Sequence, residues 1–199
     1  MPARQDARMS ISSIDPSPRT GRLLHRPGLY LARICEFDST LCVRINKTSR
    51  YRWVRRFFRL VSRLGDGVFW YAILLGLMLS EGSAGWLPCL HIAATGICAT
   101  LLYKWLKGRT LRPRPYEVHQ DISLTGIPLD RFSFPSGHTL NAVALGTVIL
   151  AYYPALLLLV LPFIVLVALS RVILGLHYPS DVAAGAAIGG MVAGCSLLL

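Results

Sequence analysis

The longest uncharged segment of the chain sets the strongest limit on its fold. Between Phe132 and Ser170 there is no Asp, Glu, Lys or Arg. One membrane-spanning helix needs about 20 apolar residues, so this segment is too long for a single span. The Tyr-Tyr-Pro sequence at 152–154 divides it, because proline disfavours helical backbone in the residue before it. The segment therefore predicts two consecutive membrane-spanning helices, at residues 137–153 and 154–174.

Three other apolar stretches have compositions that suit a membrane interior: residues 68–80, 84–103 and 182–199. The second has no formal charge, whereas the first is short and needs neighbouring residues to complete a span. In the third, the four-residue spacings of Gly185 with Gly189 and of Gly190 with Gly194 suit close helix packing. The sequence thus predicts an all-α integral membrane helical bundle of about five spans, or six if another span lies within residues 30–64.

Composition excludes several other classes of protein. Of the 199 residues, 53% are hydrophobic and 16% are charged, which argues against a disordered or collagenous chain. The net charge of +11 could suggest nucleic-acid binding, but most of the Lys and Arg residues lie before residue 64. No zinc-finger, RRM or helix-turn-helix pattern accompanies them, so we expect no nucleic-acid partner and instead contact with anionic lipids. The five cysteines form no C-x-x-C pair and are expected to pack as small apolar residues.

The first 64 residues are expected to form two regions ahead of the membrane domain. Residues 1–29 are rich in Arg, Ser and Pro and lack an apolar stretch of signal-peptide length, which predicts a disordered basic tail. Residues 30–64 are expected to contain an amphipathic interfacial helix, with Ser49 available as its N-cap. In this helix apolar residues at helical spacing alternate with basic ones: Arg52, Arg55, Arg56, Arg59 and Arg63. Residues 65–199 are then the transmembrane domain.

Three polar clusters interrupt the apolar stretches, at residues 107–115, 134–138 and 170–181. The second and third are joined by a helical hairpin whose arms are each near one membrane thickness, so both open on the same side. The first cluster belongs to the loop that leads into the second. Connectivity therefore predicts that all three clusters meet at one end of the bundle.

The residue types in these clusters suit phosphoryl chemistry. Arginine can hold a phosphoryl group with two parallel hydrogen bonds, and lysine adds a point charge. The Pro135-Ser136-Gly137 sequence at a helix start offers free backbone N–H groups and the positive end of the helix dipole. Two histidines can divide the work, one attacking phosphorus and the other protonating the leaving oxygen. Asp181, four residues after His177, could hold that imidazole ring.

Each residue taken alone also has a simpler explanation. The basic residues of the first cluster could be positive-inside loop charges, and Ser136 and Asp181 could be helix N-caps. His138 could be an interfacial histidine at a helix start. Arg171 is harder to explain in this way, because an ionisable group near the end of an apolar helix is costly unless paired or hydrated. The joint spacing of the clusters favours a functional site.

This spacing resembles the pattern of the type 2 phosphatidic acid phosphatases, the PAP2 and acid phosphatase/vanadium haloperoxidase superfamily. The resemblance rests on Lys107 with Arg114-Pro115, on Pro-Ser-Gly-His at 135–138, and on Ser170-Arg171 followed by His177 and Asp181. It implies phosphoester hydrolysis with no metal or other cofactor, through a phosphohistidine on His177 positioned by Asp181, with His138 as general acid. It also implies that the phosphoryl oxygens are held by Lys107, Arg114, Ser136, Gly137 and Arg171, with Arg112 in support.

The resulting expectation is a membrane lipid phosphatase acting on a phosphate monoester or diphosphate. Phosphatidate, phosphatidylglycerophosphate and polyprenyl diphosphate are the substrates considered. A phosphotransferase would use the same catalytic residues, and a non-catalytic transporter is a third reading, while haloperoxidase activity is disfavoured because the spans leave no soluble scaffold. We expect a protein of the bacterial inner membrane. The positive-inside rule predicts that its catalytic face is cytoplasmic, but a sixth span in residues 30–64 would place the basic tail and the site on opposite sides. The sequence leaves the oligomeric state open.

Overall fold

The computed structural model describes residues 26–199, which are helical throughout their regular structure and contain no strand. Most of the basic tail expected at 1–29 lies outside the described residues, and its last four residues belong to the first helix. The helices are α1 (Arg26–Asn46), α2 (Arg52–Arg63), α3 (Phe69–Glu81), α4 (Trp86–Thr110), α5 (Pro115–Val118), α6 (Gly137–Tyr152), α7 (Leu157–Ile173) and α8 (Pro179–Leu197). Short helical turns link several of them: η1 (Lys47–Arg50), η2 (Leu64–Val68), η3 (Gly82–Gly85) and η4 (Pro154–Leu156).

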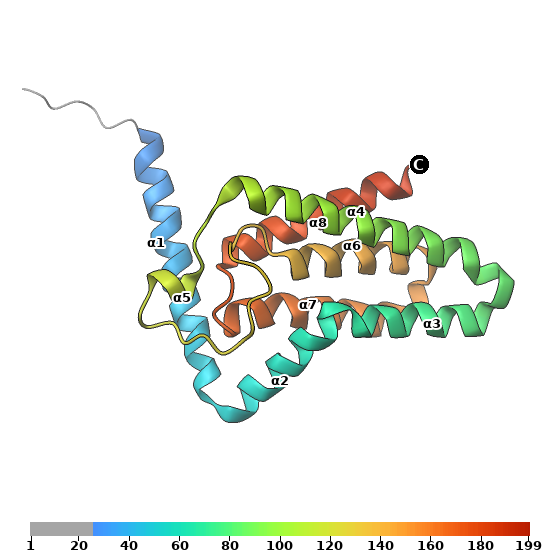
Figure 1. Cartoon of the computed structure of the whole chain (residues 1–199), viewed down its shortest axis with the longest axis horizontal. Coiled ribbons are helices and arrows are strands. Elements are labelled where there is room, and N and C mark those ends of the chain that lie inside the picture. Colours follow the sequence, from blue (N-terminus) through green and yellow to red (C-terminus); the bar gives the residue numbers. More distant parts are fainter. Residues whose placement is uncertain (1–25) are drawn as a thin grey trace, which may run out of the picture.

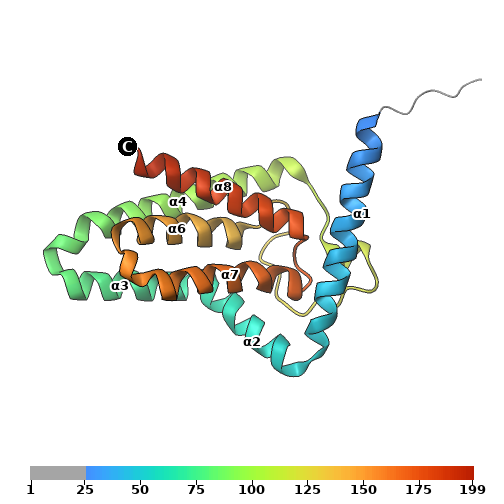
Figure 2. The same ribbon diagram turned by 180° about the vertical axis from the view of Figure 1, so that it is seen from behind.

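Five helices, α3, α4, α6, α7 and α8, run side by side as a bundle (Figures 1 and 2). Helix α6 is central and packs against α4, α7 and α8. Helix α1 crosses one end of this bundle, and α2 runs obliquely from it back to α3 (Figure 1). The long loop between α4 and α6, which includes α5, lies at the same end as α1 and α2.

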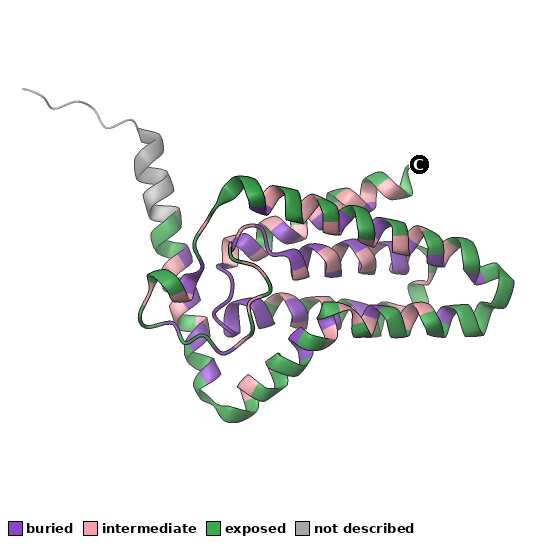
Figure 3. Ribbon diagram, in the orientation of Figure 1, coloured by how far each residue is buried: buried purple, intermediate pink, exposed green. Residues whose placement is uncertain are grey.

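Exposed residues lie on the outer faces of the bundle (Figure 3), and many of them are large and apolar, as expected where hydrocarbon replaces water as the solvent. Leu79 on α3 and Leu158 on α7 are 78% and 89% exposed. Three helical stretches are long and apolar enough to cross a membrane, namely Arg52–Val118, Pro154–Ile173 and Pro179–Leu197, and Gly137–Tyr152 is a shorter apolar helix. The all-helical membrane architecture is thus as predicted, while the count of five spans stays a prediction.

Two glycines of α8 allow it to pack directly on α6. A Cβ on Gly185 would lie 2.6 Å from the carbonyl oxygen of Ser136, and a Cβ on Gly189 would collide with that of Leu140. A Cβ on either residue of the other predicted pair, Gly190 or Gly194, would meet no atom of another helix within 4 Å. One of the two glycine spacings therefore brings helices together, and the other does not.

Two further glycines shape the ends of helices near the catalytic clusters. Gly67 has a φ of 147° where the helical chain kinks between α2 and α3, and Gly175 has a φ of 76° in the turn after α7. Both values are readily adopted only by glycine. The turn at Gly175 leads directly to His177.

Helix α1 is fixed to the bundle by the side chain of Asn46, which is buried. Its amide nitrogen donates to the carbonyl oxygens of Ile173 at 2.9 Å and Ser123 at 3.1 Å, and its oxygen accepts from the Ser123 N–H at 2.9 Å. The end of α1 is thereby joined to the end of α7 and to the long loop. Ser49 lies within η1, and Tyr51 precedes α2, so the prediction of Ser49 as the N-cap is wrong. Ser49 lies two residues before the N-cap position, which Tyr51 occupies.

Candidate active site

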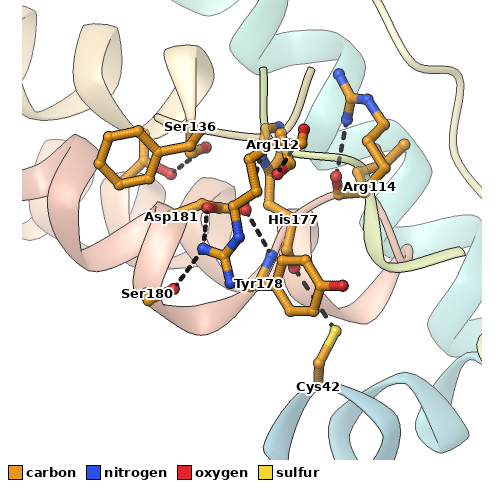
Figure 4. Close-up of polar contacts among 12 residues, drawn as sticks. Cys42, Arg112, Arg114, Ser136, His177, Tyr178, Ser180 and Asp181 are labelled. Atoms are coloured by element: carbon orange, nitrogen blue, oxygen red, sulfur yellow. Dashed lines mark hydrogen bonds and ion pairs between the residues drawn. The ribbon is translucent and has the colours of Figure 1, made fainter. Parts of the chain in front are cut away.

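The three polar clusters meet at the end of the bundle that α1 crosses. The Ser136 N–H, at the start of α6, donates to the carbonyl oxygen of Asp181 on α8 at 3.1 Å. Arg114, from the loop after α4, donates through Nη1 to the carbonyl oxygen of Leu176 at 2.8 Å (Figure 4). These bonds connect the first and second clusters to the third, which runs from the last turn of α7 to the first turn of α8.

Two of the three predicted phosphate-binding cations are buried without a negative partner. The Arg114 guanidinium donates only to backbone carbonyl groups, those of Leu176 and Asp130, and Arg171 donates through Nη1 to the Ser62 hydroxyl at 2.5 Å. Each arginine is 1% exposed, and neither forms an ion pair with any residue in the described part of the chain. A buried charge of this kind is costly until an opposite charge arrives. The two guanidinium groups are therefore a candidate site for an anion.

Lys107 has a carboxylate partner that the sequence analysis did not identify. Its Nζ lies 2.5 Å from Oδ2 of Asp130, in the loop before α6. Burial alone would raise the pKa of the Asp130 carboxyl, but the hydrogen bond and charge of Lys107 lower that pKa below its usual value. Asp130 also accepts from Arg114 through its backbone carbonyl, at 3.0 Å and 2.7 Å. This one loop residue thus positions two of the cations.

His177 is almost fully buried, at 1% exposed, and its backbone N–H donates to the carbonyl oxygen of Arg171 at 3.1 Å. Burial lowers the pKa of the His177 imidazole well below its usual value, and the nearby charges of Arg171 and Arg114 lower it further. The ring is therefore neutral at pH 7, which is the form a nucleophile requires.

Asp181 lies beside His177 but does not form a hydrogen bond with it. Oδ2 of Asp181 is 3.7 Å from Nδ1 of His177, and this ring nitrogen has no hydrogen-bond partner among the described residues. The same Oδ2 accepts from the backbone N–H of Tyr178 at 2.9 Å. The predicted orienting contact is thus close to, but beyond, hydrogen-bond length.

Arg112 binds two carboxylates from opposite ends of the described chain. Its Nη1 lies 2.6 Å from Oδ1 of Asp181 and 2.8 Å from the Ser180 hydroxyl, and its Nη2 lies 2.7 Å from Oδ2 of Asp38 on α1. Asp38 also accepts from the Ser180 N–H at 2.9 Å. The structure therefore places Arg112 in support of Asp181, where the sequence analysis had expected support of the phosphoryl oxygens.

His138, in the first turn of α6, is paired through Nε2 with Oδ1 of Asp66 in η2. Ser136 immediately before α6 is buried, and its hydroxyl lies 2.9 Å from that of Thr139. A Cβ on Gly137 would lie 2.9 Å from the ring of Tyr103, so the helix start fits against α4 only with glycine there. The first-turn N–H groups of a helix have no intrahelical partner and are available to an anion.

Four residues of the site were missed by the sequence analysis: Asp38, Ser62, Asp66 and Asp130. Only one signal could have identified any of them. Ser62 and Asp66 are four residues apart and lie one turn apart on a single helical face, the spacing of neighbouring side chains. The contacts of Asp38 and Asp130 join distant parts of the chain and have no local pattern.

Fold and site together define an all-helical membrane protein with a buried candidate anion site and two histidines beside it. Residues 84–199 match the sequence model of the PAP2 superfamily. This match covers more than half of the chain and includes all three clusters, and the chain belongs to that superfamily.

Named relatives are phosphatases. A lipid A 1-phosphatase from Rhizobium etli is 26% identical over 167 residues, which cover 73% of this chain and 71% of the relative. A decaprenylphosphoryl-5-phosphoribose phosphatase from Mycobacterium tuberculosis is 33% identical over 123 residues, 61% of this chain and 64% of the relative. The predicted enzyme class, a hydrolase of phosphoric ester bonds, is confirmed.

Solved structures show the same fold. The LpxE protein of Aquifex aeolicus superposes with a TM-score of 0.69 at 28% identity, over 80% of this chain and 94% of that one. A transmembrane PAP2-type phosphatidylglycerolphosphate phosphatase from Bacillus subtilis gives a TM-score of 0.57 at 26% identity, over 79% and 83% of the two chains. The chain is thus an integral membrane protein, as predicted.

Proposed function

We propose that this protein is a lipid phosphatase that hydrolyses a phosphate monoester or diphosphate through a phosphohistidine on His177. The observation that supports this most directly is the pair of buried arginines, Arg114 and Arg171. Their guanidinium groups have no carboxylate partner in the described chain. A dianionic phosphoryl group is the ligand that forked guanidinium donors bind best. The bound phosphoryl group would lie next to the neutral imidazole of His177.

In the proposed first step, Nε2 of His177 attacks phosphorus, because Nδ1 is the nitrogen beside Asp181. The bond from phosphorus to the lipid oxygen breaks, and His138 gives that oxygen a proton. As the imidazole gains positive charge, Asp181 stabilises it from the Nδ1 side. Catalytic geometry often tightens only when substrate is bound, so the 3.7 Å separation can shorten in the complex.

In the second step, a water molecule attacks the phosphohistidine. His138 takes the proton from this water, the P–N bond breaks, and inorganic phosphate leaves with His177 restored as a neutral base. The pairing of His138 with Asp66 supports this role, since a carboxylate on one ring nitrogen fixes the ring orientation. Lys107, Arg114 and Arg171 offset the charge on the phosphoryl oxygens in both steps.

The substrate is proposed to be a lipid whose phosphate lies at headgroup level, drawn from phosphatidate, phosphatidylglycerophosphate and polyprenyl diphosphate. Relatives named for lipid A and for decaprenylphosphoryl-5-phosphoribose support a lipid phosphate of this kind. A release assay for inorganic phosphate across these lipids tests the proposal. Turnover is expected to persist in EDTA and to stop with vanadate, which adopts the trigonal bipyramid of phosphoryl transfer. Loss of turnover in EDTA that a divalent cation restores would contradict it.

We further propose that the site faces the cytoplasm across a bacterial inner membrane. Basic side chains gather at the end of the bundle that carries the site, while the turns at the other end, Gly82–Gly85 and Pro154–Leu156, have no Lys or Arg. Three of the native cysteines are exposed, so the test begins from a cysteine-free variant. A cysteine at Ile127, which is 69% exposed in the long loop, should resist an impermeant reagent in intact cells, and one at Ser83 should react. The reverse labelling would place the site outside.

A further inference from the structure

Helix α2 and the turn that follows it carry four polar side chains on one face. Arg59, Ser62, Arg63 and Asp66 recur at the spacing of successive turns of a helix. Ser62 contacts Arg171, and Asp66 contacts His138, so this face borders the catalytic centre. The two arginines lie on the same face but form no hydrogen bond or ion pair with the proposed catalytic residues.

All four of these side chains line a cavity of about 450 Å³ next to the site. Its other walls come from residues 124–129 of the long loop and from the end of α7, and they include several apolar side chains: Leu124, Ile127, Leu129 and Leu174. A cavity with guanidinium groups on one wall and leucine and isoleucine on the other suits an amphiphilic anion.

The donors of this cavity are largely unused. Arg59 donates through Nε to the backbone carbonyl of Thr125. Its guanidinium forms no other hydrogen bond with a described residue. Arg63 forms neither an ion pair nor a side-chain hydrogen bond within residues 26–199. The hydroxyl of Thr125 is buried and has no partner among the described residues. The one carboxylate in the lining, Asp66, is already paired with His138.

We propose that this cavity, which we call the Arg59/Arg63 pocket, binds a second phosphoryl group of the substrate while the scissile one occupies the His177 site. The proposal rests on the proposed lipid phosphatase function and narrows its substrate class. It selects lipids with two phosphoryl groups, such as phosphatidylglycerophosphate, over phosphatidate, which has one. Arg59, Arg63 and the Thr125 hydroxyl supply donors to the second group, and the apolar wall contacts the carbon atoms that join the two.

General attraction to anionic lipid would not need such a pocket, and the same helix offers a matched control. Arg52 and Arg56 also belong to α2 and are exposed, but neither lines the pocket. Replacing them removes the same charge from the same helix, with little change in helix propensity for Arg→Gln. Variants at the two positions therefore separate a bound phosphoryl group from a diffuse surface charge.

The test compares kcat/KM for phosphatidylglycerophosphate and phosphatidate of equal chain length in detergent micelles. Arg63→Gln is expected to reduce the ratio of the two values about tenfold, and Arg59→Gln/Arg63→Gln further, because charge-assisted hydrogen bonds to phosphate are lost. The Arg52→Gln/Arg56→Gln variant should keep the wild-type ratio. Equal losses on both lipids in Arg63→Gln, or the same change in the control variant, would overturn the proposal.

A binding measurement keeps the test independent of turnover. Glycerol 1,3-bisphosphate should raise the Tm of the wild-type protein more than glycerol 3-phosphate does, and Arg63→Gln should abolish that difference. Equal shifts with the two ligands in the wild-type protein would reject the pocket. Failure of the wild-type enzyme to release phosphate from these two lipids and from polyprenyl diphosphate would instead reject the lipid phosphatase function.

Discussion

The two ends of the described chain contribute differently to the site. The segment that matches the PAP2 superfamily, residues 84–199, carries both site histidines, Asp181 and the three proposed phosphate-binding cations. The segment from α1 to η2 carries none of these, but it contributes contacts to residues of the site: Asp38 to Arg112, Ser62 to Arg171 and Asp66 to His138. The proposed reacting groups thus lie in the part common to the family, while some of the contacts that hold the site come from the part outside it.

The largest effect is expected from the C-terminal segment. His177→Ala should reduce turnover by at least about 10⁴-fold and abolish any acid-labile phosphoenzyme, because the proposed nucleophile is gone. Trapping with a ³²P-labelled lipid phosphate measures both. His91→Ala, at the other end of the bundle where its ring bonds to Tyr152, is the matched control. A phosphoenzyme in His177→Ala would disprove the assignment.

His138→Ala should have the next largest effect, and the loss should depend on the leaving group. For a lipid alkoxide, which needs protonation, we expect a loss of about 10²- to 10⁴-fold. An aryl phosphate leaves with little protonation and should be affected less. Rapid-quench rates of phosphoenzyme formation with the two substrates provide the comparison, and equal losses would exclude His138 as the acid.

Asp66→Asn tests the N-terminal segment directly. We expect a loss of about 10- to 100-fold in kcat, since the negative charge that pairs with the proposed acid is removed and only a neutral acceptor remains. The loss should again be greater for alkyl than for aryl substrates, a pattern that a purely structural role would not produce. Asp121→Asn, an exposed position outside every ion pair of the described residues, serves as the control. If only Asp121→Asn changed activity, the N-terminal contribution would be refuted.

The titration of His177 should reveal the influence of the cations around it. Burial and the charges of Arg171 and Arg114 lower its pKa, so the imidazole should titrate below about 6.5, the ordinary value. The unfolded chain then binds more protons than the native one just below that pH, and lowering the pH through this range should destabilise the protein. Imidazole NMR of labelled protein, compared between wild type and His177→Ala, measures the pKa. A midpoint above 6.5 would contradict the description of the site.

The smallest effects concern the packing of α8 on α6. Gly185→Ala or Gly189→Ala should lower stability by about 1–3 kcal/mol, because the added methyl group meets backbone atoms of α6. Gly190→Ala and Gly194→Ala meet no atom within 4 Å and should leave Tm unchanged or slightly higher. Thermal unfolding in one detergent compares all four variants. Equal shifts at the two pairs would show that this contact does not hold the helices together.

Helix positions in the membrane region were largely predictable, since apolar composition marks them. The helix expected at 137–153 is observed at Gly137–Tyr152. The apolar run at 84–103 marks only part of α4, which continues to Thr110 and carries Lys107 into the site. Hydropathy reports which residues contact lipid, not where the helical hydrogen bonds end. A charged last turn is therefore missed.

The residues proposed as reacting groups were predictable as one cluster, because they occur in short motifs of fixed spacing. Their partners were not, because Asp38 and Asp130 meet Arg112 and Lys107 only after distant segments fold together. Arg112 was expected to support the phosphoryl oxygens, whereas in the structure it forms ion pairs with two carboxylates. A sequence motif indicates which side chains can bind a phosphate. Which carboxylates pair with those side chains depends on which segments lie close together in the fold.

The link from Asp38 through Arg112 to Asp181 also has a consequence for biosynthesis. Asp38 belongs to the first described helix to leave the ribosome, and Asp181 belongs to the last. Arg112, synthesised midway, can complete its two ion pairs only when α8 has been made and has inserted beside α6. A growing chain that stops before α8 would lack this link, so the catalytic centre is assembled only once translation has passed Asp181.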